Sequence, residues 1–431
     1  MASACGGRCA AASRMFAGGS AAPVDSTTVI VTAGDPTPAP ASSAGSSGKA
    51  PLSGVVTVPP ASVETPGASA SATAVPVPAK TVIAASATPA FGSTDIAPSA
   101  PVTVTVPQGS ITDFALTNPD GKKVEGKLSA DNRTWTLGEV LGYGKVYTAA
   151  GTVTAADGST TPISGTFTTV SPTSRVSTRI SPGDGEVVGV AAPVIVKFSV
   201  KPGDRALVQK SLVITTTPAV EGSWGWVQHD DGQWAADWRP KDYWPANTVV
   251  HVEANTYGVD FGGGNWGGDD LTSDFTIGRN QVVKADVNSH ELVVYQAGVV
   301  VATYDASYGK GTNEDQTTRS GIHVVSEKFQ DKLMSNPKYG YENLLEHWAV
   351  RISANGEFIH ANPNTVSQQG NTNVSNGCVN LSSEHAEAYF NSAIYGDPVE
   401  VTGTDVPLSA KDGDIFDWSV PYNVWQSLSA S

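Results

Sequence analysis

The fold is decided by two short segments, which read Phe358-Ile-His360 and Gly370-Asn-Thr-Asn-Val-Ser-Asn-Gly-Cys-Val-Asn-Leu381. His360 ends an apolar run typical of a strand, and Cys378 follows 18 residues later, after a polar loop rich in Gly and Asn. A thiol is a useful nucleophile only as a thiolate, and a nearby imidazole takes its proton and later returns one to the leaving group. The two segments therefore predict a catalytic pair, with Cys378 as nucleophile and His360 as general base.

The residues before this cysteine also suit acyl transfer. Gly377 lets the backbone come close to a substrate carbonyl, and the N–H groups of Asn376, Gly377 and Cys378 are candidates for an oxyanion hole. Cys5 and Cys9 lie within the first ten residues, so the rest of the chain holds one cysteine and no disulfide framework. The competing interpretation of a lone cysteine is a small buried hydrophobe without a catalytic role.

Around the cysteine the chain reads Ser375-Asn376-Gly377-Cys378-Val379-Asn380. Preceded by a histidine at the end of a strand, this hexapeptide resembles the signature of the L,D-transpeptidase (YkuD-like) catalytic domain. Other segments resemble the family's strand pair, mobile flap, immunoglobulin-like module and C-terminal extension, which correspond in that order to residues 348–360, 334–340, 185–198 and 417–425. The resemblance covers residues 96 to 431 and is greatest to mycobacterial members, which suggests an actinobacterial source.

The resemblance implies a reaction on peptidoglycan. Cys378 would attack the carbonyl of the third residue of a tetrapeptide stem and expel the terminal D-Ala, with His360 as base. In the family this histidine is oriented through a backbone carbonyl rather than a carboxylate. An amine from the diaminopimelate of a neighbouring stem would then resolve the thioester and give a 3→3 crosslink.

The resemblance also assigns binding residues and partners. By position, Asn355, Gly356 and Asn380 match residues that contact substrate, and Met334 and Tyr341 match the flap. Donor and acceptor tetrapeptide stems are the expected partners, and carbapenems are the expected inhibitors. The family needs no cofactor and no metal, so we expect none here.

The chain departs from the family pattern at three positions. Asn376 replaces the usual His before Gly-Cys, and Ala361 and Asn364 stand where Ser and Trp often follow the base. The Asn376 departure removes a titratable group near the nucleophile and leaves open a non-catalytic scaffold that binds the cell wall. An L,D-carboxypeptidase, in which water resolves the same acyl-enzyme, is a second alternative that the sequence does not exclude.

The expected fold is mostly β. Two immunoglobulin-like β-sandwiches precede a β-sandwich-like catalytic domain that has one clear helix and a C-terminal extension. Residues 1–95 are almost entirely Ala, Ser, Thr, Pro, Gly and Val, and such a stretch buries too little apolar surface to offset its ordering entropy, so it should be a tether. The remaining boundaries are 96–175 and 176–277 for the sandwiches, 278–403 for the catalytic domain and 404–431 for the extension.

Local patterns support this division. Residues 102–106 alternate as in a half-buried strand, and Ala297-Gly298 separates two apolar runs as a tight hairpin does. One helix follows the cysteine, with apolar residues on a single face and a serine cap at Ser382 or Ser383. A group of tryptophans in the second sandwich is interpreted as core rather than as a sugar-binding surface, and it comprises Trp224, Trp226, Trp234, Trp238 and Trp244.

Charge argues against a nucleic-acid partner. The formal net charge is −15 and the isoelectric point is about 4.8, whereas nucleic-acid binding requires a basic face. The histidines other than His360 are scattered without the spacing of metal ligands, so they predict no metal site.

The N-terminus gives a separate prediction about location. Met1-Ala-Ser-Ala-Cys5 resembles the end of a bacterial lipoprotein signal, so Cys5 is a candidate for lipidation and the protein is expected in the extracytoplasmic cell envelope. A chance cysteine in an Ala/Ser-rich tail explains the same residues equally well. The chain has no apolar run of about 18 residues that would form a membrane-spanning helix.

Overall fold

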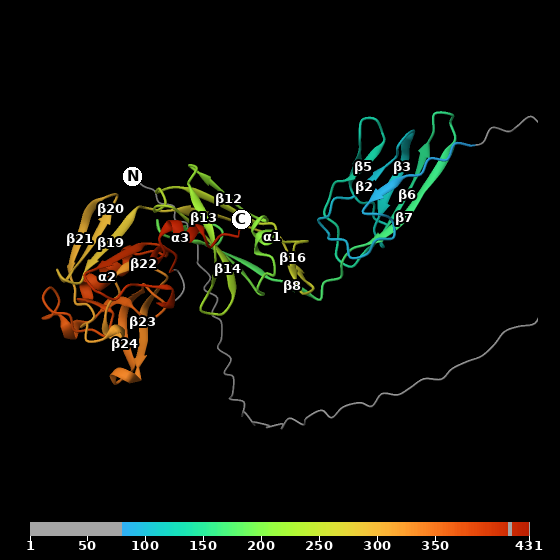
Figure 1. Cartoon of the computed structure of the whole chain (residues 1–431). Coiled ribbons are helices and arrows are strands. Elements are labelled where there is room, and N and C mark those ends of the chain that lie inside the picture. Colours follow the sequence, from blue (N-terminus) through green and yellow to red (C-terminus); the bar gives the residue numbers. More distant parts are fainter. Residues whose placement is uncertain (1–79, 413–415, 431) are drawn as a thin grey trace, which may run out of the picture. The chain divides into compact units, whose positions relative to one another are not determined.

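The computed structural model describes residues 80–412 and 416–430, which are folded mostly into β-strands (Figure 1). Their buried apolar side chains form three separate clusters, which lie within residues 83–167, 176–277 and 283–401. The predicted mostly-β fold class is therefore confirmed. Over these same residues, no helix combines the length and the apolar character needed to cross a membrane. Cys5 lies outside the described residues.

The first sandwich is built from a four-stranded sheet in the order β1-β2-β5-β4 and a three-stranded sheet in the order β3-β6-β7. Its strands are β1 (Ser86–Thr88), β2 (Thr103–Thr105), β3 (Ser110–Thr117), β4 (Gly126–Leu128), β5 (Thr134–Leu137), β6 (Val146–Thr154) and β7 (Thr160–Thr168). Strand β1 pairs with β2, and Ile83 is only 4% exposed in the core. Residues 80–95 were expected in the tether, but this pairing and burial place them in the folded sandwich.

The second sandwich packs two four-stranded sheets, in the orders β13-β14-β11-β9 and β10-β18-β15-β12, and adds a small sheet β16-β17-β8 and helix α1. The elements are β8 (Ser174–Val176), β9 (Thr178–Ser181), β10 (Val187–Val188), β11 (Val194–Phe198), α1 (Arg205–Gln209), β12 (Leu212–Thr217), β13 (Gly222–Gln228), β14 (Trp234–Pro240), β15 (Val249–Ala254), β16 (Asp260–Gly262), β17 (Asn265–Gly267) and β18 (Leu271–Ile277). Trp226, Trp238 and Trp244 are buried in its core, as predicted, and Trp224 packs against it. Trp234 was also expected in the core, but it is only partly buried and its ring lies under the guanidinium of Arg205.

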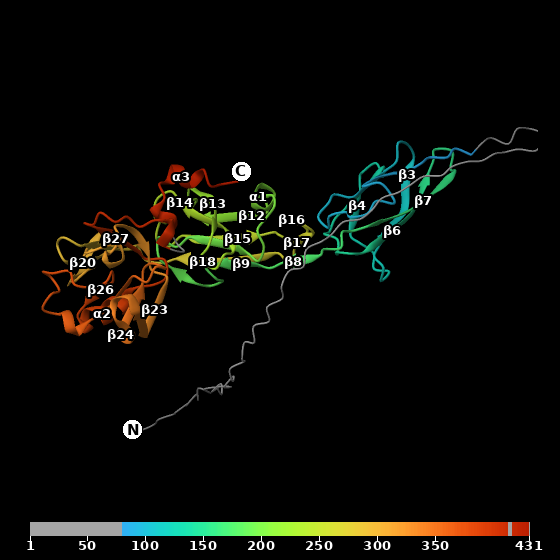
Figure 2. The same cartoon turned by 60° about the horizontal axis from the view of Figure 1, so that its bottom comes forward.

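The C-terminal segment folds back onto this second sandwich. It contains the 3-10 helices η4 (Ala410–Asp412) and η5 (Phe416–Ser419) and helix α3 (Tyr422–Gln426), which lies beside β13 and β14 in both ribbon views (Figures 1 and 2). Trp425 is fully buried and donates its indole N–H to the carbonyl of Ser223 at 2.9 Å. Trp418 donates in the same way to Ala191.

The third unit holds two sheets that share one core with helix α2. The sheet orders are β21-β20-β19-β27-β22 and β23-β24-β25-β26. The elements are β19 (Gln281–Asp286), β20 (Glu291–Gln296), β21 (Val299–Asp305), η1 (Glu314–Gln316), β22 (Gly321–Val324), β23 (Glu327–Asn336), η2 (Pro337–Tyr339), β24 (Tyr341–Arg351), β25 (Phe358–Ala361), η3 (Pro363–Thr365), β26 (Val379–Leu381), α2 (Ser383–Ser392) and β27 (Pro398–Thr402). The second of these sheets carries the functional residues.

Two local predictions in this unit are confirmed. Strands β20 and β21 form a hairpin whose turn residues, Ala297 and Gly298, both have positive φ, as a tight turn requires. Helix α2 begins after Ser382, whose hydroxyl accepts the N–H of His385 at 3.2 Å. The helix ends at Ser392.

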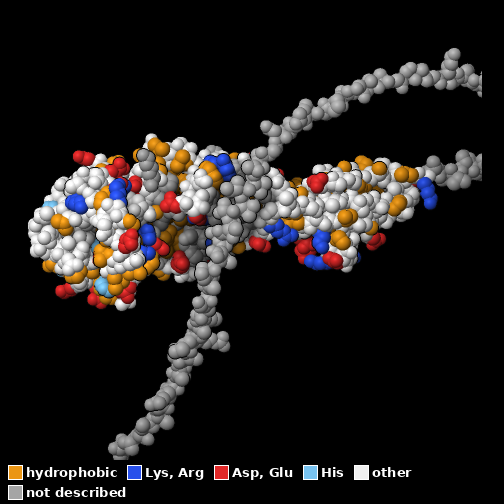
Figure 3. Space-filling view, turned by 90° about the horizontal axis from the view of Figure 1, so that it is seen from below, with side chains coloured by type: hydrophobic (Ala, Val, Ile, Leu, Met, Phe, Trp, Pro, Cys, Tyr) orange, Lys and Arg blue, Asp and Glu red, His pale blue; other side chains and the backbone are white. Residues whose placement is uncertain are grey.

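The surface carries both signs of charge. On the face shown in Figure 3, acidic and basic side chains are interspersed, and neither forms a continuous field. The excess of acidic groups in the composition is therefore spread over this face instead of gathered at one place.

Candidate active site

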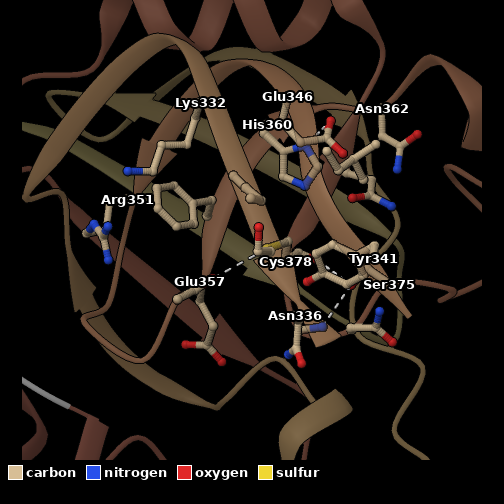
Figure 4. A pocket seen from close by; sticks show the side chains of 18 of the residues that line it. Lys332, Asn336, Tyr341, Glu346, Arg351, Glu357, His360, Asn362, Ser375 and Cys378 are labelled. Atoms are coloured by element: carbon tan, nitrogen blue, oxygen red, sulfur yellow. Dashed lines mark hydrogen bonds and ion pairs between the residues drawn. The ribbon is translucent and has the colours of Figure 1, made fainter. Parts of the chain in front are cut away.

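A cleft of about 590 Å³ opens between the β23–β24 hairpin and the loop that leads into β26 (Figure 4). Every site residue predicted from the sequence, apart from Cys5, lines this cleft. These residues are Met334, Tyr341, Asn355, Gly356, His360, Asn376, Gly377, Cys378 and Asn380. The structure therefore brings together residues that span 47 positions of the sequence.

The backbone explains why the predicted nucleophile and base meet. Strands β25 and β26 are parallel neighbours, and His360 is in register with Asn380. The loop before β26 consequently places Cys378 beside the end of β25, where its thiol lies next to the imidazole of His360. The thiol also contacts the carbonyl of Gly356, with Sγ and O 3.6 Å apart. Cys378 is partly exposed in the cleft, so the alternative of a buried structural cysteine does not hold.

The imidazole of His360 is fixed by two acceptors on its other side. Its Nδ1 lies 3.0 Å from the carbonyl oxygen of Ala361 and 3.1 Å from Oε2 of Glu346. The family resemblance implied a backbone carbonyl rather than a carboxylate, and here both are present. This expectation is corrected because Glu346, on β24, reaches the same nitrogen.

These contacts change the protonation of His360. Burial alone lowers the pKa of the imidazole, but the hydrogen bonds to Cys378 and Glu346 outweigh burial and raise the pKa of His360 to about 10. The protonated imidazole is thus stabilised once it has taken the thiol proton. His360 then holds this proton ready for a leaving group.

The backbone at Gly377 differs from the expected oxyanion hole. Gly377 has a φ of +124°, a conformation that side chains disfavour, which explains the glycine. Its N–H, however, already donates to Oγ of Ser375 at 3.1 Å, so Gly377 does not present a free donor to the cleft. Among the described residues, the N–H groups of Asn376 and Cys378 have no hydrogen-bond partner and are the donors that remain.

The side chain of Asn376 is held in a neutral network. Its Oδ1 accepts a hydrogen bond from Nε2 of Gln316 at 2.7 Å. Gln316 is itself fixed through its Oε1, which accepts hydrogen bonds from Thr312 and Asn313. The position directly before Gly377 is therefore occupied by an amide whose orientation is set by Gln316 of η1.

The turn that carries the predicted binding residues is tied to the C-terminal segment. The side chain of Asn355 donates to Oδ1 of Asp412 at 3.1 Å, and the same carboxylate accepts from Nε of Arg319 at 2.6 Å. Asn380 is only 2% exposed. A substrate-contacting role for the side chains of Asn355 and Asn380 remains a prediction, whereas the carbonyl of Gly356 contacts the nucleophile directly.

The predicted flap is the hairpin of β23 and β24, which are joined through η2. Met334 and Tyr341 lie on this hairpin and face the cleft. Burial, with smaller contributions from Cys378 and Glu346, raises the pKa of Tyr341. The tyrosine is therefore a neutral hydrogen-bonding group beside the nucleophile.

Positive charge at one side of the cleft was not foreseen from the sequence. Lys332 on β23 and Arg351 on β24 project toward it (Figure 4). Arg351 is paired with Glu327 at 2.6 Å, whereas Lys332 forms no ion pair within the part of the chain that the structure describes and lies over the ring of Phe329. A strand of alternating charged and apolar residues gives no sign of which charges face a ligand.

The sequence did not point to Glu346 because the register between β24 and β25 shifts. Val350 pairs with Ile359, but His347 pairs with Ala361, so one extra residue of β24 lies between the two pairs. Without the shift, His347 would lie on the same face of the sheet as His360. With the shift, Glu346 lies on that face instead. Trp348, whose φ is +53°, lies within the bulge, and no sequence pattern marks its position.

Comparison with known proteins identifies the families to which the domains are similar. Residues 93–260 match the bacterial Ig domain family, and residues 280–401 match the L,D-transpeptidase catalytic domain family. The chain is 48% identical over 343 residues to L,D-transpeptidase 5 of Mycobacterium tuberculosis, which covers 79% of this chain and 76% of that protein. It is 36% identical over 348 residues to L,D-transpeptidase 2 of the same species, covering 79% and 83%.

Solved structures give a partial match. An L,D-transpeptidase in complex with imipenem is 33% identical, covers 54% of this chain and 99% of its own, and has a TM-score of 0.45. L,D-transpeptidase 3 from Mycobacterium tuberculosis, in complex with a faropenem-derived adduct, is 29% identical, covers 53% and 98%, and has a TM-score of 0.43.

Proposed function

This chain belongs to the L,D-transpeptidase family and is an L,D-transpeptidase, and we propose that it forms 3→3 peptidoglycan crosslinks through a thioester on Cys378. The observation that carries the proposal is the contact of Cys378 with His360 at the floor of the cleft. A thiol beside an imidazole with an orienting partner is the arrangement that nucleophilic catalysis requires.

The first half of the reaction acylates the enzyme. Sγ of Cys378 attacks the carbonyl of the third stem residue, and the thiol proton passes to Nε2 of His360. The N–H groups of Asn376 and Cys378 stabilise the negative oxygen of the tetrahedral intermediate. The C–N bond to the terminal D-Ala then breaks, and His360 gives its proton to the departing amine.

The second half transfers the acyl group. The side-chain amine of a neighbouring stem attacks the thioester, and His360 takes a proton from that amine as the new amide forms. The C–S bond breaks, and the sulfur receives the proton back from His360. The enzyme returns to its starting state, and the chemistry needs no co-reactant beyond the two stems.

The charges of the cleft fit a peptide that carries carboxylates. Stem peptides bear carboxyl groups at the terminal D-Ala, and they also bear one on the diaminopimelate where it is not amidated. Arg351 on the flap side of the cleft is paired with Glu327, whereas Lys332 forms no ion pair among the described residues. The charge of Lys332 supports an anionic stem as donor.

The alternative of a non-catalytic scaffold rested on the missing His before Gly-Cys. The amide of Asn376, which stands at that position, is fixed by Gln316 and leaves the Cys378–His360 contact intact, so the missing His no longer argues for a scaffold. Carboxypeptidase activity uses the same acyl-enzyme and differs only in the acceptor.

The proposal is tested with purified disaccharide-tetrapeptide. Crosslinking predicts a dimer whose mass equals two substrates minus one D-Ala, and tandem mass spectrometry places the new bond between two third-position residues. Cys378→Ala should give no dimer. If the wild-type enzyme releases D-Ala but yields only tripeptide monomers, the protein is a carboxypeptidase. If it does neither, the proposed function is wrong.

We propose further that carbapenems acylate Cys378 and that the protein is anchored in the cell envelope through a lipid on Cys5. The first proposal is supported by the accessible thiol, and the second by the Ala-Ser-Ala-Cys sequence at residues 2–5. In a host that processes lipoproteins, Cys5→Ala should move the protein from the membrane fraction to the soluble fraction. An unchanged distribution would contradict anchoring at this cysteine.

A further inference from the structure

We propose that Glu346 is a positioning residue for the base, so that this enzyme works through a Cys378–His360–Glu346 chain. The inference rests on the proposed function, because it concerns how the base of that reaction is held. The carboxylate acts through the imidazole and touches neither substrate nor the reacting sulfur in our account.

The geometry fixes which nitrogen of His360 carries a proton. Both groups at Nδ1, the carbonyl of Ala361 at 3.0 Å and the carboxylate of Glu346 at 3.1 Å, are acceptors. Nδ1 must therefore be the N–H, and Nε2 is left to exchange a proton with Cys378. A carbonyl alone would set this tautomer, so the carboxylate adds something more than orientation.

What the carboxylate adds is charge in a site shielded from water. Glu346 is 9% exposed and His360 is 4% exposed. The attraction between an imidazolium and a carboxylate at hydrogen-bond distance is strong where water does not screen it. Glu346 therefore stabilises His360 in the form that holds the proton taken from Cys378, which is the form present in both tetrahedral intermediates.

The backbone of β24 determines where the side chain of Glu346 points. The extra residue in β24 turns Glu346 onto the face of His360, where the regular register would have put His347. In the observed structure His347 faces away, is exposed and pairs with Asp331 at 2.6 Å. Bulges next to active sites commonly re-aim one side chain in this way.

Among the residues that the structure describes, no other charged group is placed for this function. Lys332 of β23 and Arg351 of β24 also line the cleft, but neither is among the groups that raise the pKa of His360. Tyr341 of β24 is neutral because its pKa is raised. Helix α2 also packs on β25, but its His385 lies against Tyr304, and its Tyr389 interacts with Asp397 and Arg279. Cys378 and Glu346 are the groups whose hydrogen bonds raise the pKa of His360.

The consequence for pH dependence has a definite sign. The pKa of His360 is raised above its ordinary value, so the imidazolium is stabilised below that raised pKa and is lost as pH rises through it. Loss of this proton leaves no acid for the leaving group, which ends activity at high pH. Removal of the charge on Glu346 should lower the pKa of His360 and move the alkaline limb of the acylation profile to lower pH.

The test compares three variants of the full chain. Glu346→Gln keeps the size and an acceptor but removes the charge, Glu346→Asp keeps the charge, and Glu342→Gln removes an exposed charge from the same strand as a control. The rate of carbapenem acylation is followed by intact mass as a function of pH. Glu346→Gln should move the alkaline limb to a pH that is lower by about one unit or more. Glu346→Asp should cause a smaller shift, and Glu342→Gln should cause none.

A second readout does not need the reaction. The chain has seven histidines, so histidine-selective isotope labelling and comparison with His360→Gln identify the His360 signal in an NMR titration of the resting protein. Glu346→Gln should lower the pKa of His360. If the pKa of His360 is unchanged in Glu346→Gln and the acylation rate falls by the same factor at every pH, Glu346 is only structural and the inference is wrong. Failure of the wild-type enzyme to form an adduct would instead refute the proposed function, and the titration would still decide the role of Glu346.

Discussion

Asn355 and Asp412 are joined by two hydrogen bonds, one from the backbone N–H of Asn355 to the carbonyl of Asp412 and one between their side chains, both at 3.1 Å. Residue 412 belongs to the C-terminal segment, and Asn355 precedes Gly356, whose carbonyl contacts the catalytic thiol. The C-terminal segment therefore supports one wall of the cleft in addition to covering the second sandwich.

This link predicts the effect of removing Asp412. Its carboxylate is nearly buried and pairs with Arg319, so Asp412→Ala removes one of the two carboxylates that hold this half-buried guanidinium, the other being that of Glu357. We expect the free energy of unfolding to fall by about 1–3 kcal/mol, the usual scale for removing one partner of a buried hydrogen-bonded pair. Chemical denaturation measures the change, with Asp405→Ala at an exposed neighbouring position as control. An effect no larger than that of the control would contradict the supporting role.

The role of His360 as base predicts a large kinetic effect. His360→Ala should reduce the rate of acylation by about 10²–10⁴, the scale of general acid–base catalysis. Stopped-flow fluorescence with a carbapenem measures this rate, and His347→Ala provides a control at an exposed histidine of the neighbouring strand. A fall of less than about threefold would show that His360 is not the base.

Asn376 should contribute a neutral contact and no titrating group. Because its side chain accepts one hydrogen bond from Gln316, worth about 0.5–1.5 kcal/mol, Asn376→Ala should cost about tenfold or less in acylation rate. Gln316→Ala should have a similar effect, and the double variant should be little worse than either single one. Asn376→His should remain active with an altered pH profile. If Asn376→Ala is as inactive as His360→Ala, then Asn376 is an essential catalytic group.

The folded part of the chain predicts where truncation becomes harmful. A protein that begins at residue 80 should acylate at the rate of the full chain, because the catalytic cleft lies within residues 315–380. A protein that begins at residue 96 lacks β1 and the buried Ile83, so its first sandwich should melt at a lower temperature. Equal melting of the two fragments would contradict the assignment of residues 83–88 to that sandwich.

Sequence reasoning succeeded where the determinants are local. The Ala297-Gly298 turn and the cap at Ser382 are set by neighbouring residues, and the Cys378–His360 pair follows from a strand and a short loop. Sequence reasoning failed where the conformation depends on how distant strands pair and pack. The register shift that aims Glu346 at His360 arises between two strands, and Ile83 is buried only because the rest of the first sandwich packs around it. The composition of these two segments shows neither the register shift nor the burial.

The roles of His360 and Glu346 both depend on acylation of Cys378. The direct measurement is intact-mass spectrometry of the protein after exposure to a carbapenem, followed by peptide mapping, in a chain with Cys5→Ser and Cys9→Ser so that one thiol remains. We expect a single adduct on the peptide that contains Cys378, with none in Cys378→Ala. An adduct of the same mass that persists in Cys378→Ala, or an unmodified Cys378 after prolonged exposure, would contradict this expectation.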